Sequence, residues 1–180
     1  MFLDVWAQEV FGWLCHQDAS RSFAPGGVVL AVCARCVGVY AGFVLVLPAV
    51  VVARRLNRPL GIWLHGILVV QVALFGFDLI PHGPTIRTVS GQLFAVGVVY
   101  FLYMGICSVR NNKTQTHGIW LLRSLLVVAL AVVGLQLLLR LPWGWTATAV
   151  NSLALTGLAV VCVMTVIFLF RICSAAFGRR

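Results

Sequence analysis

Charged residues are scarce in this sequence. Of its 180 residues, 9% are charged and 62% are hydrophobic, and the mean hydropathy is +1.04. A soluble globular domain carries about 25% charged residues, so this composition excludes one and predicts a chain surrounded largely by lipid. The length suits a single domain. We find no linker rich in Pro, Gly or Ser, no low-complexity tract and no internal repeat that would divide it.

Acidic residues are the rarest of the charged types, with four Asp and Glu against thirteen Lys and Arg. The net charge of +9 raises the question of nucleic acid. The arginines, however, stand in short clusters between apolar runs, where positive charge orients a membrane protein. We therefore expect no nucleic-acid partner. No Lys or Arg precedes Arg21, and Asp4 and Glu9 interrupt the first apolar run, so we expect no secretory signal peptide.

Long apolar runs are abundant instead. Five of them are long enough to cross about 30 Å of hydrocarbon, and they cover residues 37–53, 60–77, 88–107, 119–139 and 146–170. Ahead of them, the segment from Phe2 to Leu14 is apolar on one helical face but too short to span, which is typical of an interfacial amphipathic helix. The sequence predicts an all-α integral membrane protein with about five transmembrane helices, one interfacial helix and a single domain over 1–180.

The basic residues are distributed unequally between the two sides that five spans would create. Nine of the thirteen lie on the side of the carboxyl terminus, and all four acidic residues lie on the side of the amino terminus. Because positive charge is retained in the cytoplasm, we expect an inner (plasma) membrane protein with its amino terminus outside and its carboxyl terminus in the cytoplasm. The region 1–36 then lies on the outer face.

This outer region carries metal-ligating residue types. Cys33-Ala-Arg-Cys36 has the Cys-x-x-Cys spacing that is common in zinc half-sites, and Cys15 and His16 offer the other half. Neighbouring residues point about 100° apart on a helix, so Cys15 and His16 ligate together only if the backbone leaves helical geometry. An alternative is a thiol–quinone redox protein with a Cys33–Cys36 disulfide, although only Cys15 remains to act as a relay.

Four further outer-face residues suggest chemistry beside this metal. Asp78 is a candidate general base or metal ligand, or it pairs with Arg87, and His82 offers another ligand. Arg21 and Arg87 have the guanidinium groups that hold phosphate. One hypothesis is a zinc-dependent hydrolase or transferase acting on a lipid or lipid-linked anionic substrate. The alternative is a structural metal in a scaffold, either a homo-oligomer or a subunit of a larger membrane complex.

The motifs Cys-His-Gln, Arg-Ser-Phe, Cys-Ala-Arg-Cys and Gly-x-Tyr-x-Gly resemble those of the uncharacterised prokaryotic membrane proteins grouped as domain of unknown function 2085. The resemblance covers about residues 12–107. It implies a membrane protein and names no activity. The positions that match the family are Cys15, His16, Arg21, Ser22, Cys33, Arg35, Cys36, Gly38, Tyr40, Gly42, Asp78, Arg87 and Gly91.

Small and polar residues inside the spans indicate how the helices pack. Gly38 and Gly42 form a Gly-x-x-x-Gly face, which favours close approach of two helices. His65 is expected to pack with its ring hydrogen-bonded. Interhelical hydrogen bonds are the expected role of isolated amides such as Gln71 and Asn151, and the same holds for Gln136.

Overall fold

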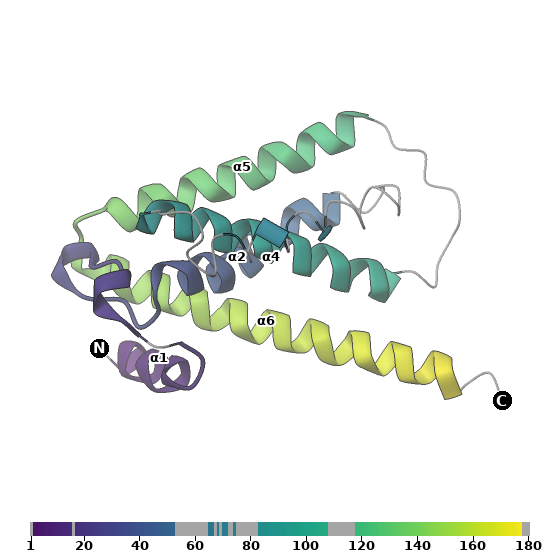
Figure 1. Cartoon of the computed structure of the whole chain (residues 1–180), viewed down its shortest axis with the longest axis horizontal. Helices are drawn as coiled ribbons and strands as arrows, with labels where there is room; N and C mark the ends of the chain where they lie inside the picture. The colour runs from purple at the N-terminus through teal and green to yellow at the C-terminus, as the bar shows by residue number, and fades with distance from the viewer. Residues whose placement is uncertain are drawn as a thin grey trace.

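The computed structural model describes residues 2–15, 17–52, 65–66, 68, 70–71, 74, 83–107 and 118–177 (Figure 1). All regular elements in these ranges are helices, which confirms the all-α prediction for this part of the chain. They are α1 (Phe2–Gly12), the single-turn 3-10 helices η1 (Ala19–Arg21) and η2 (Pro25–Gly27), α2 (Ala34–Val52), α4 (Pro84–Cys107), α5 (Gly118–Arg140) and α6 (Gly144–Phe177).

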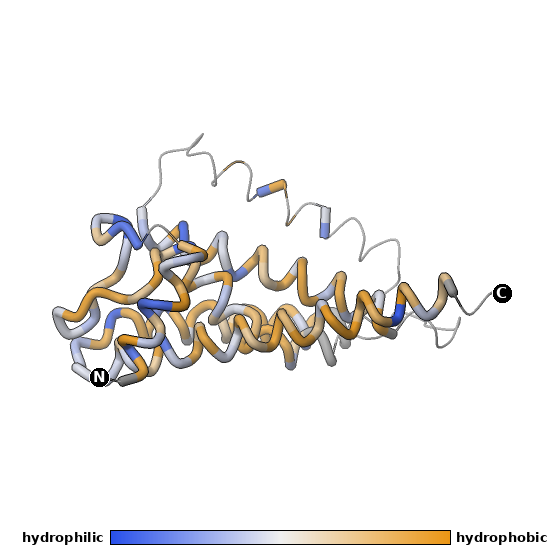
Figure 2. Tube along the Cα trace, turned by 90° about the horizontal axis from the view of Figure 1, so that it is seen from below, coloured by the Kyte–Doolittle hydropathy of each residue, from blue (hydrophilic) through white to orange (hydrophobic). Residues whose placement is uncertain are grey.

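Three of these helices are long and apolar enough to cross a membrane, over Pro84–Ile106, Leu122–Arg140 and Gly144–Ala176. The apolar part of α2, Ala34–Ala49, is shorter. Most of the predicted span 60–77 lies outside the described residues. Figure 2 shows apolar residues along the length of the helices and the larger hydrophilic segments at the end that holds the amino terminus. The described helices thus fit a membrane protein and include three candidate spans.

Glycines bring α2 and α4 into backbone contact. A Cβ on Gly38 would collide with the carbonyl of Thr88, and a Cβ on Gly42 would lie 2.9 Å from the Cβ of Ala95. Gly91 of α4 lies equally close to the α2 backbone. These contacts confirm the close packing predicted for Gly38 and Gly42. They also align the amino-terminal ends of α2 and α4 at one end of the bundle.

α6 completes the core at the same end. Its Gly157 lies against the carbonyl of Tyr40 in α2, and α6 begins where α5 ends (Figure 1). The buried side chains of this core come from α1, the loop before α2, and α2, α5 and α6. They are Ala7, Phe11, Leu30, Ala31, Val32, Val37, Ala41, Leu135, Leu139, Ala147, Val150 and Ala154.

The interfacial helix α1 is present, and it packs on the start of α6. Ala7 and Phe11, four residues apart on one face, are fully buried, and the ring centroid of Phe11 lies 5.0 Å from that of Tyr40. Leu3 and Trp6, which belong to the predicted apolar face, are about half exposed. Of this face, Phe11 therefore points into the protein, whereas Leu3 and Trp6 lie at the surface.

Two polar residues within the bundle behave as expected. The Nδ1 atom of His65 lies 2.7 Å from the carbonyl oxygen of Gly97, and its ring stacks on Phe101. The amide of Gln71 donates to the carbonyl of Ser90 at 2.9 Å. Both predictions are confirmed, because each polar side chain satisfies a backbone group of a neighbouring helix.

Candidate metal centre

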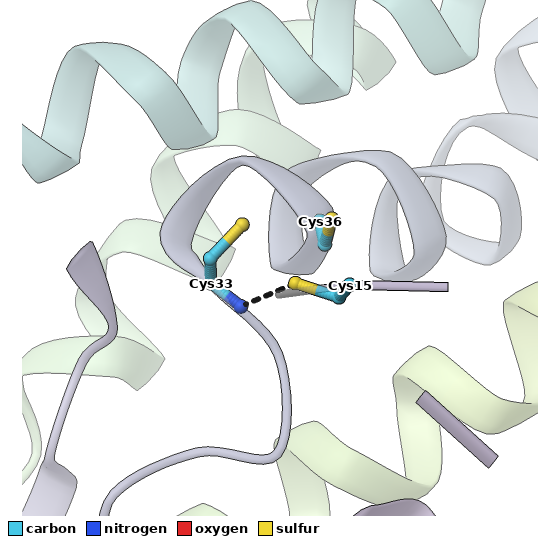
Figure 3. A group of neighbouring side chains, drawn as sticks. All are labelled: Cys15, Cys33 and Cys36. Atoms are coloured by element: carbon cyan, nitrogen blue, oxygen red, sulfur yellow. Dashed lines mark hydrogen bonds between the residues drawn. The ribbon is translucent and has the colours of Figure 1, made fainter. Parts of the chain in front are cut away.

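Cys15 meets the Cys33–Cys36 pair, which lies in a separate segment of the chain, at the amino-terminal end of α2 (Figure 3). The sulfur atoms of Cys15, Cys33 and Cys36 all lie within 4.8 Å of one another, and all three residues are free thiols. Cys15 is 8% exposed, and the other two are partly buried. The grouping of these three predicted ligands is therefore present in the structure.

The Cys-x-x-Cys pair is positioned by the first turn of α2. Cys33 immediately precedes the helix, and its carbonyl accepts the N–H of Val37 at 2.9 Å. Residues three apart in a helical turn lie on the same side, so the side chain of Cys36 returns to that of Cys33. Hydrogen bonds from the Cys36 thiol to Cys15 and Cys33, together with burial, raise the pKa of Cys36 well above its ordinary value of 9.0.

Cys15 reaches the pair because the chain turns back after α1. Its N–H donates to the carbonyl of Phe11 at 2.8 Å, and its sulfur accepts the N–H of Cys33 at 3.4 Å. Hydrogen bonds from the thiols of Cys33 and Cys36, joined by the backbone N–H groups of Cys33 and Gln17, hold the pKa of Cys15 far below its ordinary value of 9.0, although burial opposes the shift. Cys15 is therefore the thiol that carries negative charge most readily.

A cavity of about 770 Å³ opens beside the sulfur atoms. Arg21 lies in its wall, with its Nε 3.3 Å from the carboxylate of Asp18. Asp18 also accepts hydrogen bonds from the backbone N–H and the hydroxyl of Ser20, so it caps η1. The cavity therefore combines soft ligands with cationic side chains. Its lining residues are Leu14, Cys15, Asp18, Arg21, Cys33, Arg35 and Cys36.

Arg87 lies near this cavity although it is distant in the sequence. Its neighbour Thr88 donates its hydroxyl to the carbonyl of Ala34 at 3.0 Å, which ties the start of α4 to the start of α2. Hydrogen bonds from Ser20 contribute most to the lowered pKa of Asp18, and the charges of Arg21 and Arg87 lower it further. Two predicted site residues, His16 and Asp78, lie outside the described residues, as does His82.

Sequence reasoning missed the roles of Asp4 and Gln17, whereas the interhelical hydrogen bond expected of Asn151 is present. Asp4 in α1 accepts hydrogen bonds from Thr148 and Asn151 of α6, both at 3.0 Å. The side-chain Oδ1 of Asn151 in turn accepts the N–H of Ala31 at 3.2 Å, and the side chain of Gln17 donates to the carbonyl of the same loop residue. The available signals were a carboxylate inside an apolar amino-terminal segment and an amide next to Cys15 and His16 in the Cys-His-Gln motif.

Comparison with known proteins supports the motif-based assignment. A family model described as "Predicted membrane protein (DUF2085)" matches residues 15–101, a stretch that includes all three cysteines and Arg87. This stretch, just under half of the chain, is similar to the DUF2085 family. The match confirms the resemblance and the membrane class that it implies. No curated protein and no solved structure matches the chain.

Proposed function

We propose that this protein holds a zinc ion between Cys15, Cys33 and Cys36 on the outer face of the membrane. The observation that carries the proposal is the convergence of three thiols from two separate segments. Zn–S bonds of about 2.3 Å set the sulfurs of a tetrahedral site about 3.8 Å apart. Sulfurs that already lie within 4.8 Å of one another need only a small contraction to reach that arrangement. His16, a water molecule or a substrate supplies the fourth ligand.

The orientation is part of the proposal. With five spans across the inner membrane, the amino terminus and the thiol cluster lie outside the cell membrane, and the carboxyl terminus lies in the cytoplasm. The asymmetry of basic residues supports this arrangement, with nine of thirteen on the carboxyl-terminal side. Exposed tryptophans at the thiol end, Trp13 after α1 and Trp143 and Trp145 at the start of α6, suit a membrane interface in either orientation.

The same cavity suits a reaction on an anionic substrate. Arg21 lines it and Arg87 lies near it, and guanidinium groups pair with phosphate oxygens through parallel hydrogen bonds. Leu14 adds an apolar wall that is 51% exposed. A lipid or lipid-linked phosphate fits this combination. We propose a metal-dependent hydrolase or transferase in which zinc polarises the substrate and Asp78 moves the proton.

A redox function is the second candidate, and a specific observation favours it. Cys33 and Cys36 stand at the start of a helix with Cys15 bonded to the backbone of Cys33, an arrangement that also suits a reactive dithiol and a third relay thiol. It predicts a Cys33–Cys36 disulfide that cycles with a membrane quinone. In that case the purified protein contains no metal.

Metal content separates the two candidates. The detergent-purified protein is analysed by elemental mass spectrometry beside a Cys33→Ser, Cys36→Ser variant and a control that carries Cys162→Ser and Cys173→Ser, two exposed cysteines of α6. We expect about one zinc per chain in the wild type and in the control, and none in the first variant. A metal-free wild type with a Cys33–Cys36 disulfide would overturn the metal site and favour the redox function.

Two further measurements test the remaining parts. In a background in which the six native cysteines are replaced by Ser, a membrane-impermeant maleimide applied to intact cells should label Glu9→Cys, an exposed position of α1, and should leave Ala176→Cys unlabelled until the cells are broken. The reverse pattern would contradict the orientation. Substitution of Arg21 and Arg87 by Gln should abolish binding of phosphate-bearing lipid while zinc is retained. Unchanged lipid binding would contradict a phosphate-bearing lipid as the substrate and would leave only the metal site.

A further inference from the structure

Gln17 connects the two cysteine-bearing segments through its side chain. Its Nε2 donates to the carbonyl of Gln8 in α1 at 2.7 Å and to the carbonyl of Ala31 at 3.0 Å. Gln17 follows Cys15 by two residues, and Ala31 precedes Cys33 by two. One side-chain amide therefore connects the segment that carries Cys15, the segment that carries Cys33, and helix α1.

The backbone of Gln17 has an unusual conformation. Its φ of 49° makes it the one non-glycine residue with positive φ in the described part of the chain. The left-handed region disfavours side chains other than Asn, Asp and Gly. The conformation directs the N–H of Gln17 to the sulfur of Cys15. The two side-chain hydrogen bonds of Gln17 help to hold the backbone in this conformation.

Ala31 is fixed from its other side as well. Its N–H donates to Asn151 of α6 at 3.2 Å, so both polar groups of this residue have side-chain partners. Asn151 is 2% exposed and is itself held by Asp4 at 3.0 Å. The α6 side of the loop is thus anchored to the bundle. Gln17 is the side chain that sets the distance from this anchored loop to Cys15.

We propose that Gln17 is the positioning residue of the thiol site: its amide fixes Cys15 at the distance from Cys33 that a shared metal requires. This inference rests on the proposed metal site. Gln17 does not itself ligate the metal. It acts through the backbone carbonyl of Ala31 and through its own N–H, in the manner of the outer hydrogen bonds that orient metal ligands.

The test compares Gln17→Glu with Gln8→Glu in the full-length protein in detergent. Glutamate at position 17 keeps the length of the side chain but replaces the donating NH2 by an acceptor that faces two carbonyls. Gln8 is exposed and accepts the hydrogen bond from Gln17 through its backbone carbonyl, so the control variant Gln8→Glu keeps this hydrogen bond. We expect zinc affinity, measured by competition with a chromophoric chelator, to fall about 10–100-fold in Gln17→Glu and to stay unchanged in Gln8→Glu. Affinities of the two variants within twofold of each other would overturn the proposal.

A second readout does not depend on metal. In a Cys36→Ser background, a mild oxidant removes two electrons and two protons from Cys15 and Cys33 and joins them in a disulfide, which peptide mass spectrometry quantifies. We expect Gln17→Glu to slow this coupling severalfold, and an equal rate would overturn the positioning role. Gln17→Met, which removes the donors without adding charge, replaces Gln17→Glu if the latter does not fold. If the wild-type protein binds no zinc, the proposed metal site is wrong. The rates of Cys15–Cys33 disulfide formation still decide whether Gln17 positions Cys15.

Discussion

Replacing Gly91 by alanine should separate α2 from α4 and weaken the thiol site together with the fold. A Cβ at this position would lie 2.9 Å from the backbone nitrogen of Val39 and 3.1 Å from the carbonyl carbon of Gly38, and against the carbonyl of Arg35. All of these atoms belong to the α2 backbone, so no side chain can swing aside. The two helices must move apart instead.

The size of the effect follows from these distances. Carbon atoms pack best at about 3.5–4.0 Å, so the crossing must open by about 0.5–1 Å, which forfeits about a quarter to a half of the dispersion attraction across it. Overpacking of this kind costs about 1–3 kcal/mol. Gly134→Ala in α5 is the matched control, because a Cβ there meets nothing within 4 Å. Its helix propensity gain of up to about 1 kcal/mol also accrues to Gly91→Ala, so the two variants should differ by about 1–3 kcal/mol.

The assay is reversible unfolding in mixed micelles with increasing SDS, followed by tryptophan fluorescence and far-UV circular dichroism. Gly91→Ala should unfold at a lower SDS fraction than the wild type, and Gly134→Ala should not. Because Arg35 stands between Cys33 and Cys36, Gly91→Ala should also reduce zinc affinity. Equal unfolding midpoints for the two alanine variants would refute the reasoning from backbone contact.

Three further predictions concern charge and metal. Burial opposes ionisation of Asp4, but hydrogen bonds from Asn151 and Thr148 lower its pKa below 3.8. The ionised Asp4 therefore stabilises the fold above that pH, and this stabilisation is lost as the pH falls through the lower pKa of the folded state. Asp4→Asn should abolish this acid-dependent loss in unfolding midpoints measured from about pH 6 downward. Zinc affinity should rise with pH, because thiols release protons when they bind the metal. Since Cys15 ionises readily, about two protons or fewer should be released per zinc bound. A zinc affinity that does not change with pH in competition titrations would contradict thiolate ligation. Chelation of the metal should leave far-UV circular dichroism unchanged, whereas a structural metal would make the signal collapse.

The sequence was sufficient to predict the helices because lipid imposes a simple rule. An apolar run that spans the bilayer must be helical, since its backbone polar groups find no partner in hydrocarbon. The run 119–139 accordingly matches α5, Gly118–Arg140, and 88–107 lies within α4, Pro84–Cys107. The run 146–170 ends seven residues before α6 does, at Phe177, because the helix continues past Arg171 where hydropathy no longer marks it.

The partners of the site could not be predicted in the same way. The hydrogen bond from Asn151 to Asp4 joins residues 147 positions apart, and no local pattern in a single sequence relates them. Which face of α1 is buried depends on the start of α6, so Trp6 and Phe11 were equally plausible inward residues until the contact was known. By contrast, the Cys-x-x-Cys spacing is a local property of one helical turn, and its grouping was predictable.

The arrangement of these contacts bears on whether a metal here would be structural or catalytic. A structural zinc ties together segments that would otherwise separate. In this protein the segment that carries Cys15 is already attached to the bundle, through Phe11 in the core, Asp4 on Asn151, and Gln17 on Ala31. An added metal would therefore contribute little to holding the fold. A zinc ion held as we propose, beside a cavity with Arg21 in its wall, would instead be suited to binding and polarising a substrate.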